Sequence, residues 1–204
     1  LLLFQIQYGQ FNLIQSIKVK TQPALREGIN VEINGNRCLR SGDCEWIASA
    51  WDLTAKVDAL KEVASGDVYL FYNNVRFSKV GKGEDRKYVK VHDIENALII
   101  GPGGGRDIWA ALGVGAKNIT AVEINGATIE LMEGPLKNIS NDIYSKANIV
   151  LEDGRTFLNN TDDFFDFINL GWVDINSTSG FGNIFYENYL YTQEGVDRIL
   201  DRVT

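Results

Sequence analysis

The residues best suited to chemistry lie between positions 97 and 123, where a glycine-rich turn separates two short apolar runs. The first run covers residues 97–100, the turn covers 101–105, and the second run ends on an acid, Glu123. Glycine has no Cβ atom, so its backbone can turn sharply and pass close to a ligand. Eighteen positions separate Gly105 from Glu123, close to the spacing of about 20 residues expected between a glycine turn and an acid that binds ribose hydroxyls. The spacing predicts a site for an adenosine-containing cofactor.

Two further loops carry acids that could serve the same site. Asp153, after the apolar run at 149–151, could accept a hydrogen bond from an adenine amino group, with Gly154 letting the chain pass near the ring. An aspartate just before a helix also commonly caps the free amides of that helix, and both roles can hold together. Asp174 is the acid of the loop that follows the strand at 166–171. It is therefore the candidate general base, with an ordinary loop aspartate as the alternative.

The elements that must position these loops begin near residue 94, where strand and helix patterns alternate. Alternation of this kind predicts βαβ units and a parallel sheet whose strand ends meet at one edge, where ligands bind. The expected strands are 97–101, 118–124, 147–152 and 166–171, and the expected helices are 105–115, 126–138, 154–160 and 192–203.

The preceding residues, 1–92, are predicted to form a smaller β-rich segment with one helix. The pair Asn34-Gly35 between short apolar runs indicates a hairpin, and 68–80 shows a second β pattern with a possible turn at Asn73-Asn74. The apolar residues of 41–63, which include Trp46 and Trp51, recur at steps of three and four and predict the helix. Residues 93–204 then form the nucleoside-binding domain. It is expected to be incomplete at its C-terminus, since both ends of the chain look cut.

Composition limits the partners. The 204 residues carry a formal net charge of −7, which argues against nucleic acid because phosphate contacts need clustered lysine and arginine. No apolar run approaches the ~18–20 residues of a membrane span. Cys38 and Cys44 have no companion ligands that would complete a metal site, so no metal is expected. They are interpreted as ordinary side chains in a reducing, cytoplasmic setting.

Taken in order, the motifs GPGGGRD, AVEIN, LEDGRTFL, FDFINL and YENYLYT resemble the spermidine synthase-like branch of the class I S-adenosylmethionine-dependent methyltransferase superfamily, over roughly residues 94–200. The resemblance implies an α/β, Rossmann-like fold and S-adenosylmethionine or its decarboxylated form as cofactor. It also implies a small amine or other nucleophile as acceptor, and it makes a homodimer plausible. Glu123 would hold the ribose and Asp153 the adenine. The cofactor-binding candidates are Gly101, Gly103, Gly104, Gly105, Asp107, Glu123, Ile124, Asp153 and Gly154, and the catalytic candidate is Asp174.

Two departures from the family pattern keep three functions open. Polyamine synthases usually have a GGGDG turn, whereas the acid here, Asp107, falls later and beside Arg106. In their DSSDP-like loop the first aspartate is the base, and Gly171 takes that position here. Aminopropyl transfer, methyl transfer and a non-catalytic domain all remain: Arg106 could pair with the carboxylate of intact S-adenosylmethionine, and Gly171 cannot accept a proton. A dinucleotide dehydrogenase fits less well, because GPGGGRD breaks the G-x-G-x-x-G step.

Overall fold

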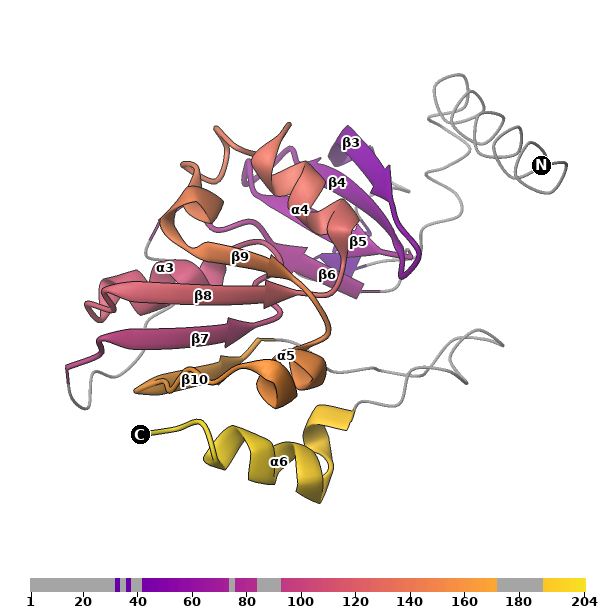
Figure 1. Cartoon of the computed structure of the whole chain (residues 1–204). Coiled ribbons are helices and arrows are strands. Elements are labelled where there is room, and N and C mark those ends of the chain that lie inside the picture. The colour runs from indigo at the N-terminus through magenta and orange to yellow at the C-terminus, as the bar shows by residue number, and fades with distance from the viewer. Residues whose placement is uncertain (1–31, 34–35, 38–41, 74–75, 84–92, 172–188) are drawn as a thin grey trace, which may run out of the picture.

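The computed structural model describes residues 32–33, 36–37, 42–73, 76–83, 93–171 and 189–204. Two four-stranded sheets, one antiparallel and one parallel, form the body of this part of the chain (Figure 1). The boundary predicted near residue 92 falls outside the described residues, as does the predicted base, Asp174.

The antiparallel sheet is a meander of consecutive strands. Its order is β3 (Cys44–Trp51), β4 (Lys56–Glu62), β5 (Val68–Tyr72) and β6 (Arg76–Lys79). The turn predicted at Asn73-Asn74 is confirmed: β5 and β6 pair from Tyr72 to Arg76, and Asn73 has a left-handed φ of 49°. The predicted hairpin around Asn34-Gly35 is also confirmed by its two strands, β1 (Glu32–Ile33) and β2 (Asn36–Arg37), which pair antiparallel.

The helix predicted over 41–63 is wrong, because β3 and β4 occupy this stretch. Asp52 ends the first strand: its carboxylate accepts hydrogen bonds from the backbone N–H of Thr54 (2.7 Å) and of Ala55 (3.0 Å) and so builds a turn. In β4, Val57 and Ala59 alternate onto the shared core, as a strand requires. Trp46 is exposed rather than part of a helix core.

The parallel sheet confirms the four predicted strands. They are β7 (Asn96–Ile100), β8 (Asn118–Glu123), β9 (Asn148–Leu151) and β10 (Phe167–Leu170), in the order β10-β7-β8-β9. The four predicted helices are present: α5 (Gly154–Asn160) has the predicted bounds, whereas α3 (Arg106–Gly113), α4 (Gly126–Glu133) and α6 (Gln193–Leu200) are shorter than predicted. Short 3-10 turns, η1 (Ile143–Lys146) and η3 (Tyr189–Tyr191), complete the set. This arrangement is the expected α/β, Rossmann-like fold preceded by a β-rich segment.

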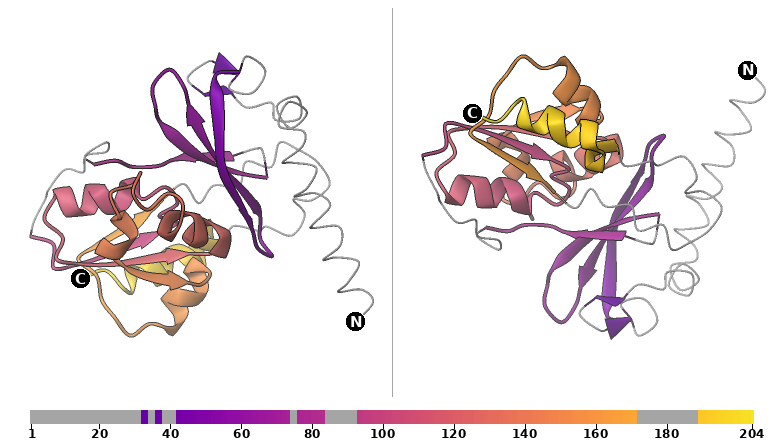
Figure 2. Two further views of the ribbon diagram at one scale, coloured as in Figure 1. Left: turned by 90° about the horizontal axis from the view of Figure 1, so that it is seen from above. Right: turned by 90° about the horizontal axis from the view of Figure 1, so that it is seen from below.

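Helices cover both faces of the parallel sheet (Figure 2). On one face, Ile99 and Ala121 pack with α3, α4 and η1 in a core that also includes Val57 and Leu70 of the antiparallel sheet. On the other face, residues such as Ile100 pack beneath α5, η3 and α6. The antiparallel sheet and the α3/α4 face of the parallel sheet therefore share one apolar core.

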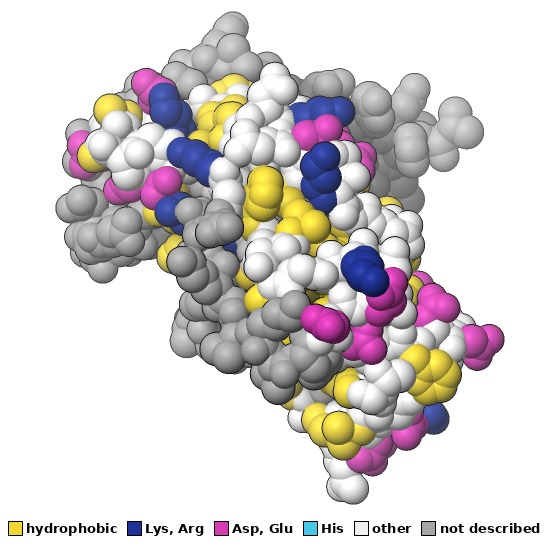
Figure 3. All heavy atoms as spheres, turned by 90° about the vertical axis from the view of Figure 1, so that its left-hand side faces the viewer, with side chains coloured by type: hydrophobic (Ala, Val, Ile, Leu, Met, Phe, Trp, Pro, Cys, Tyr) yellow, Lys and Arg dark blue, Asp and Glu magenta, His cyan; other side chains and the backbone are white. Residues whose placement is uncertain are grey.

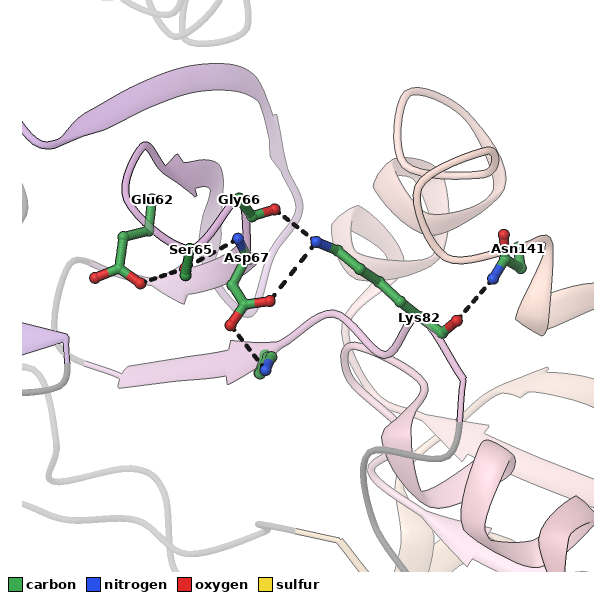
Figure 4. Close-up of polar contacts among 7 residues, drawn as sticks. Glu62, Ser65, Gly66, Asp67, Lys82 and Asn141 are labelled. Atoms are coloured by element: carbon green, nitrogen blue, oxygen red, sulfur yellow. Dashed lines mark hydrogen bonds and ion pairs between the residues drawn. The ribbon is translucent and has the colours of Figure 1, made fainter.

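A polar strap also joins the two sheets (Figure 4). Lys82, just after β6, donates through Nζ to the carbonyl of Gly66 (2.6 Å), and its Nζ lies 3.6 Å from the Asp67 carboxylate. Its own carbonyl accepts a hydrogen bond from the Asn141 side chain at 2.7 Å. Because Asn141 follows α4 in the chain, the strap fixes the exit of the antiparallel sheet against the Rossmann-like part.

In the part of the chain that the structure describes, there is no helix with the length and apolar character needed to cross a bilayer. Figure 3 views the edge of the parallel sheet where its strands begin, and lysine or arginine and acidic side chains both appear there. Cys44 is disulfide-bonded, with its partner outside the described residues, so the interpretation of an ordinary reduced side chain is wrong for this residue.

Candidate functional site

The glycine bend after β7 has a backbone that few other residues could adopt. Gly101, Gly103 and Gly105 have φ values of 76°, 48° and 79°, in the left-handed region where a Cβ atom is strained. The Gly101 N–H donates to the carbonyl of Val122 at 2.8 Å, and this bond draws the start of the bend toward β8. The bend thus lies beside the end of the strand that carries Glu123.

The carboxylate of Glu123 points into this bend. Its Oε2 accepts a hydrogen bond from the Gly103 N–H at 3.1 Å, and its Oε1 accepts one from the Asn125 N–H at 3.0 Å. The residue is 5% exposed. Each carboxylate oxygen has two acceptor sites, so the carboxylate keeps acceptor capacity beyond these two bonds and the contribution of the Ile124 amide. The arrangement is suited to hydroxyl donors.

Burial raises the pKa of the Glu123 carboxyl to about 7, although the backbone amides of Asn125, Gly103 and Ile124 oppose the shift. The charge of Asp52 makes a smaller contribution to the same rise in the pKa of Glu123. Glu123 in turn acts on two buried phenols. Burial, together with the Glu123 charge, raises the pKa of both Tyr72 and Tyr144. Both tyrosines therefore stay neutral, and the carboxyl titrates near physiological pH.

Protein atoms occupy the space that side chains would take at the bend. A Cβ atom at Gly103 would lie 2.8 Å from the Ser78 hydroxyl, and one at Gly104 would lie 2.1 Å from the Lys79 carbonyl. At Gly105 it would lie 2.6 Å from a methyl group of Ile143. These glycines therefore allow close packing of the bend on β6 and η1. Their predicted role of letting the backbone approach a sulfonium tail stays a prediction.

The amides of the bend are also engaged within the protein. The Gly104 N–H donates to the Ser78 hydroxyl at 2.9 Å, and the Gly105 N–H donates to the Pro102 carbonyl at 2.8 Å. With the Gly103 amide bound to Glu123, the amides of three successive glycines have partners. A dinucleotide site uses such amides to hold a pyrophosphate. The geometry therefore argues against the dehydrogenase alternative.

The loop after β9 has the geometry of a helix cap. Asp153 accepts hydrogen bonds from the Thr156 N–H (2.9 Å) and hydroxyl (3.1 Å) at the start of α5. A Cβ atom at Gly154 would lie 2.5 Å from a methyl group of Ile100. At the same edge Ile124 is 44% exposed and Leu151 is 61% exposed, which is unusual for aliphatic side chains at strand ends. Contact of Asp153, Gly154 and Ile124 with adenine stays a prediction.

The strand β10 brings Gly171 against the bend. The Gly171 N–H donates to the Ile100 carbonyl at 2.7 Å, and a Cβ atom at this position would lie 2.3 Å from the carbonyl oxygen of Gly101. The packing therefore leaves no room for a side chain at position 171, which the motif resemblance aligns with the base of polyamine synthases. Two residues earlier, the buried amide nitrogen of Asn169 has no hydrogen-bond partner among the described residues.

The first turn of α3 holds the other two candidates. Asp107 is buried there. The Cγ of Arg106 lies 3.2 Å from the position that a Cβ atom of Gly81 would take, so this side chain starts along the segment after β6. Among the described residues, no group of three or more His, Cys, Asp or Glu side chains could hold a metal ion.

Sequence reasoning missed the residues of the antiparallel sheet that surround Glu123. Asp52, Tyr72 and Ser78 come from this sheet, and Tyr144 comes from η1, where its hydroxyl donates to the Gly103 carbonyl at 2.8 Å. One signal was available: an aspartate followed two residues later by threonine is typical of a side-chain-built turn. Nothing in the spacing of the tyrosines points to the bend.

Comparison with solved structures identifies the fold. A crystal structure of spermidine synthase in complex with the transition-state analogue AdoDATO matches with a TM-score of 0.59 and 19% identity, over 78% of this chain and 53% of that chain. Spermidine synthase from Thermotoga maritima matches with a TM-score of 0.61 and 20% identity, over 78% of this chain and 54% of that chain. The chain thus spans about half the length of these structures. No protein-family model and no curated protein matches the sequence. The predicted spermidine synthase-like fold is confirmed.

Proposed function

We propose that this chain binds S-adenosylmethionine or its decarboxylated form at the edge where β7, β8 and β9 end, and transfers an aminopropyl or related group to a small amine. The observation that carries the proposal is the Glu123 carboxylate, which is aimed at the glycine bend and held by the amides of Gly103 and Asn125. Its remaining acceptor capacity suits the hydroxyls of a ribose. The likeness of the fold to a spermidine synthase that was solved with AdoDATO supports the same cofactor class.

The chemistry needs little from the protein beyond alignment. In aminopropyl transfer, the amine nitrogen attacks the carbon of the donor that is bonded to the sulfonium sulfur. A C–N bond forms, the C–S bond breaks, and the electron pair returns to sulfur as the neutral thioether 5′-methylthioadenosine. The nitrogen loses one proton to a base, which we assign to Asp174. We assign the orientation of the incoming nucleophile to the side-chain amide of Asn169 in β10, whose buried nitrogen has no hydrogen-bond partner among the described residues.

Gly171 is the specific observation that favours a second candidate. A Cβ atom at this position would lie 2.3 Å from the Gly101 carbonyl oxygen, so a base of the usual polyamine synthase kind has no place there. Methyl transfer from intact S-adenosylmethionine to a nucleophile that is already deprotonated would need no such base. A domain that binds the nucleoside without catalysis is the third candidate, and it shares the ribose contact of Glu123.

Isothermal titration calorimetry tests the nucleoside site itself. We expect S-adenosylmethionine or its decarboxylated form to bind, and Glu123→Ala to weaken binding at least tenfold. Glu130→Gln, an exposed change on α4, serves as the control and should bind normally. Absence of heat with both compounds in the folded protein would reject the proposal.

A product assay separates the candidate reactions. Incubation with the decarboxylated donor and a panel of di- and triamines should release 5′-methylthioadenosine, and Asp174→Asn should abolish this release. Release of S-adenosylhomocysteine from the intact donor instead would assign methyl transfer. Tight binding of either donor without any product, across the acceptors tested, would leave the non-catalytic candidate.

A further inference from the structure

Asp52, in the turn between β3 and β4, makes contacts that reach from the antiparallel sheet into the Rossmann-like part. One carboxylate oxygen accepts hydrogen bonds from the hydroxyl of Thr54 at 2.7 Å and from the side-chain amide of Asn125 at 3.1 Å. The other accepts from the N–H of Gly126, the first residue of α4, at 2.5 Å. The Asn125 amide also donates to the Thr54 hydroxyl at 2.5 Å. Residues more than 70 positions apart are thereby held together.

Asn125 connects the Asp52 turn to Glu123 through its own hydrogen bonds. Asn125 caps α4 by accepting from the Thr128 N–H at 2.9 Å. Its own backbone N–H donates to the Glu123 carboxylate at 3.0 Å. Because Asp52 and Thr54 fix the Asn125 side chain, they also fix the direction in which its backbone amide points. The orientation of the ribose-binding acid thus depends on a turn of the other sheet.

We propose that Asp52 is a positioning residue of the nucleoside site, holding Asn125 and the start of α4 so that the Glu123 carboxylate faces the glycine bend. This inference rests on the proposed function for its consequence in binding, but the geometry it describes can be tested in the ligand-free protein. Asp52 acts indirectly, through Asn125, and does not itself contact the ligand.

Charge supports the same role. Burial of Asp52 opposes its ionisation, but the hydrogen bonds from Thr54, Ala55 and Gly126 outweigh burial and hold the pKa of Asp52 below its usual value. Asp52 is therefore an anion near neutral pH, favourably placed at the positive end of α4. Its charge raises the pKa of Glu123. Among the described residues, the phenols of Tyr72 on β5 and Tyr144 on η1, both neutral, also interact electrostatically with Glu123.

The decisive experiment follows Glu123 by carboxyl ¹³C NMR in the ligand-free full chain between pH 5 and 9. In Asp52→Asn the titration midpoint of Glu123 should fall below that of the unaltered protein, and the amide signals of Gly103 and Asn125 should shift. Thr54→Val, which keeps the Asp52 charge and removes only the hydroxyl that accepts from the Asn125 amide, should shift the amide signals with little change in midpoint. It also serves if Asp52→Asn does not fold.

Binding supplies the second readout. At pH 8.5, where Glu123 is ionised, Asp52→Asn should bind adenosine about threefold to tenfold more weakly and should lose part of its preference for adenosine over 2′-deoxyadenosine. Asp67→Asn is the matched control, since Asp67 pairs with Lys79 and Lys82 on the same sheet, away from Glu123. An unchanged midpoint together with unchanged Gly103 and Asn125 signals would overturn the inference. If the NMR effects occur but no nucleoside binds the unaltered protein, the proposed function fails while the positioning role stands.

Discussion

Replacing Glu123 by glutamine should remove a strong pH dependence from the stability of this protein. The folded chain buries a carboxyl group whose pKa is raised from 4.5 to about 7. Below pH 4.5 the group is protonated in both the folded and the unfolded chain. Between pH 4.5 and 7 only the unfolded chain gives up the proton, so the free energy of unfolding falls as the pH rises, and it levels off above pH 7.

The size of the effect follows from the shift. One pKa unit corresponds to about 1.4 kcal/mol, so the full shift corresponds to ~3 kcal/mol and the part lost between pH 5 and pH 8.5 to about 2.5 kcal/mol. Glutamine carries no charge, but its NH2 group cannot accept one of the two backbone N–H bonds that Glu123 accepts. Glu123→Gln should therefore carry a constant loss of stability at every pH and should lack the fall of about 2.5 kcal/mol between pH 5 and pH 8.5 that the unaltered protein shows.

Urea denaturation at several pH values, followed by circular dichroism, measures this directly. For a chain of this size a difference of about 2.5 kcal/mol also corresponds to roughly 5–10 °C in melting temperature. Glu130→Gln, the same substitution at an exposed position of α4, should leave the pH dependence unchanged. Parallel stability curves for Glu123→Gln and the unaltered protein would refute the claim that Glu123 is buried and shifted.

Three further substitutions probe the bend. Gly104→Ala should cost about 1–3 kcal/mol through overpacking against β6, whereas Gly113→Ala, with open space around it, should be neutral or slightly stabilising in the same urea titration. Tyr144→Phe leaves the buried Gly103 carbonyl without its donor and should cost about 1–3 kcal/mol; an unchanged unfolding midpoint would contradict that bond. Gly171→Asp should lower the melting temperature and yield no new release of 5′-methylthioadenosine, so a gain of turnover would show that the backbone there can give way.

Binding of an adenosyl compound should itself depend on pH. Ribose hydroxyls need the ionised form of Glu123, which is about one tenth of the population at pH 6 and nine tenths at pH 8 if the pKa is near 7. Because apparent affinity scales with the competent fraction, the dissociation constant should be about tenfold larger at pH 6 than at pH 8. Calorimetry in two buffers of different ionisation enthalpy should also detect proton release on binding at pH 6.5. A dissociation constant that is flat over this range would contradict the ionised acceptor.

The Rossmann-like half was predictable because local signals and tertiary structure agree there. The apolar run at 97–100 is short, ends in glycines and has to be buried on both faces, which favours a parallel strand. The run that ends at Glu123 has the same character. Glu123 was therefore expected at the end of this strand. The spacing from Gly105 also predicted that its side chain serves the same site as the glycine bend.

The antiparallel sheet was harder to predict because its apolar spacing satisfies two patterns at once. Trp46, Ala50 and Val57 fit steps of three and four, but they are also separated by a turn that Asp52 builds with its own side chain. Periodicity counts apolar residues and ignores such a turn. The contribution of Asp52 to the site depends on contacts with residues more than 70 positions away, which no local pattern encodes.

The packing of the bend on β6 has a consequence for how the molecule opens. The Gly104 carbonyl accepts from the Gly81 N–H at 2.8 Å, and the Gly104 amide is closed off by Ser78. The Gly104 amide can exchange its hydrogen for deuterium only when the antiparallel sheet separates from the bend. This separation exposes the apolar core that the two sheets share. Slow exchange at Gly104 should therefore proceed at the rate of Ala59 in β4. The antiparallel sheet and the Rossmann-like part would then unfold together as one cooperative unit rather than in sequence.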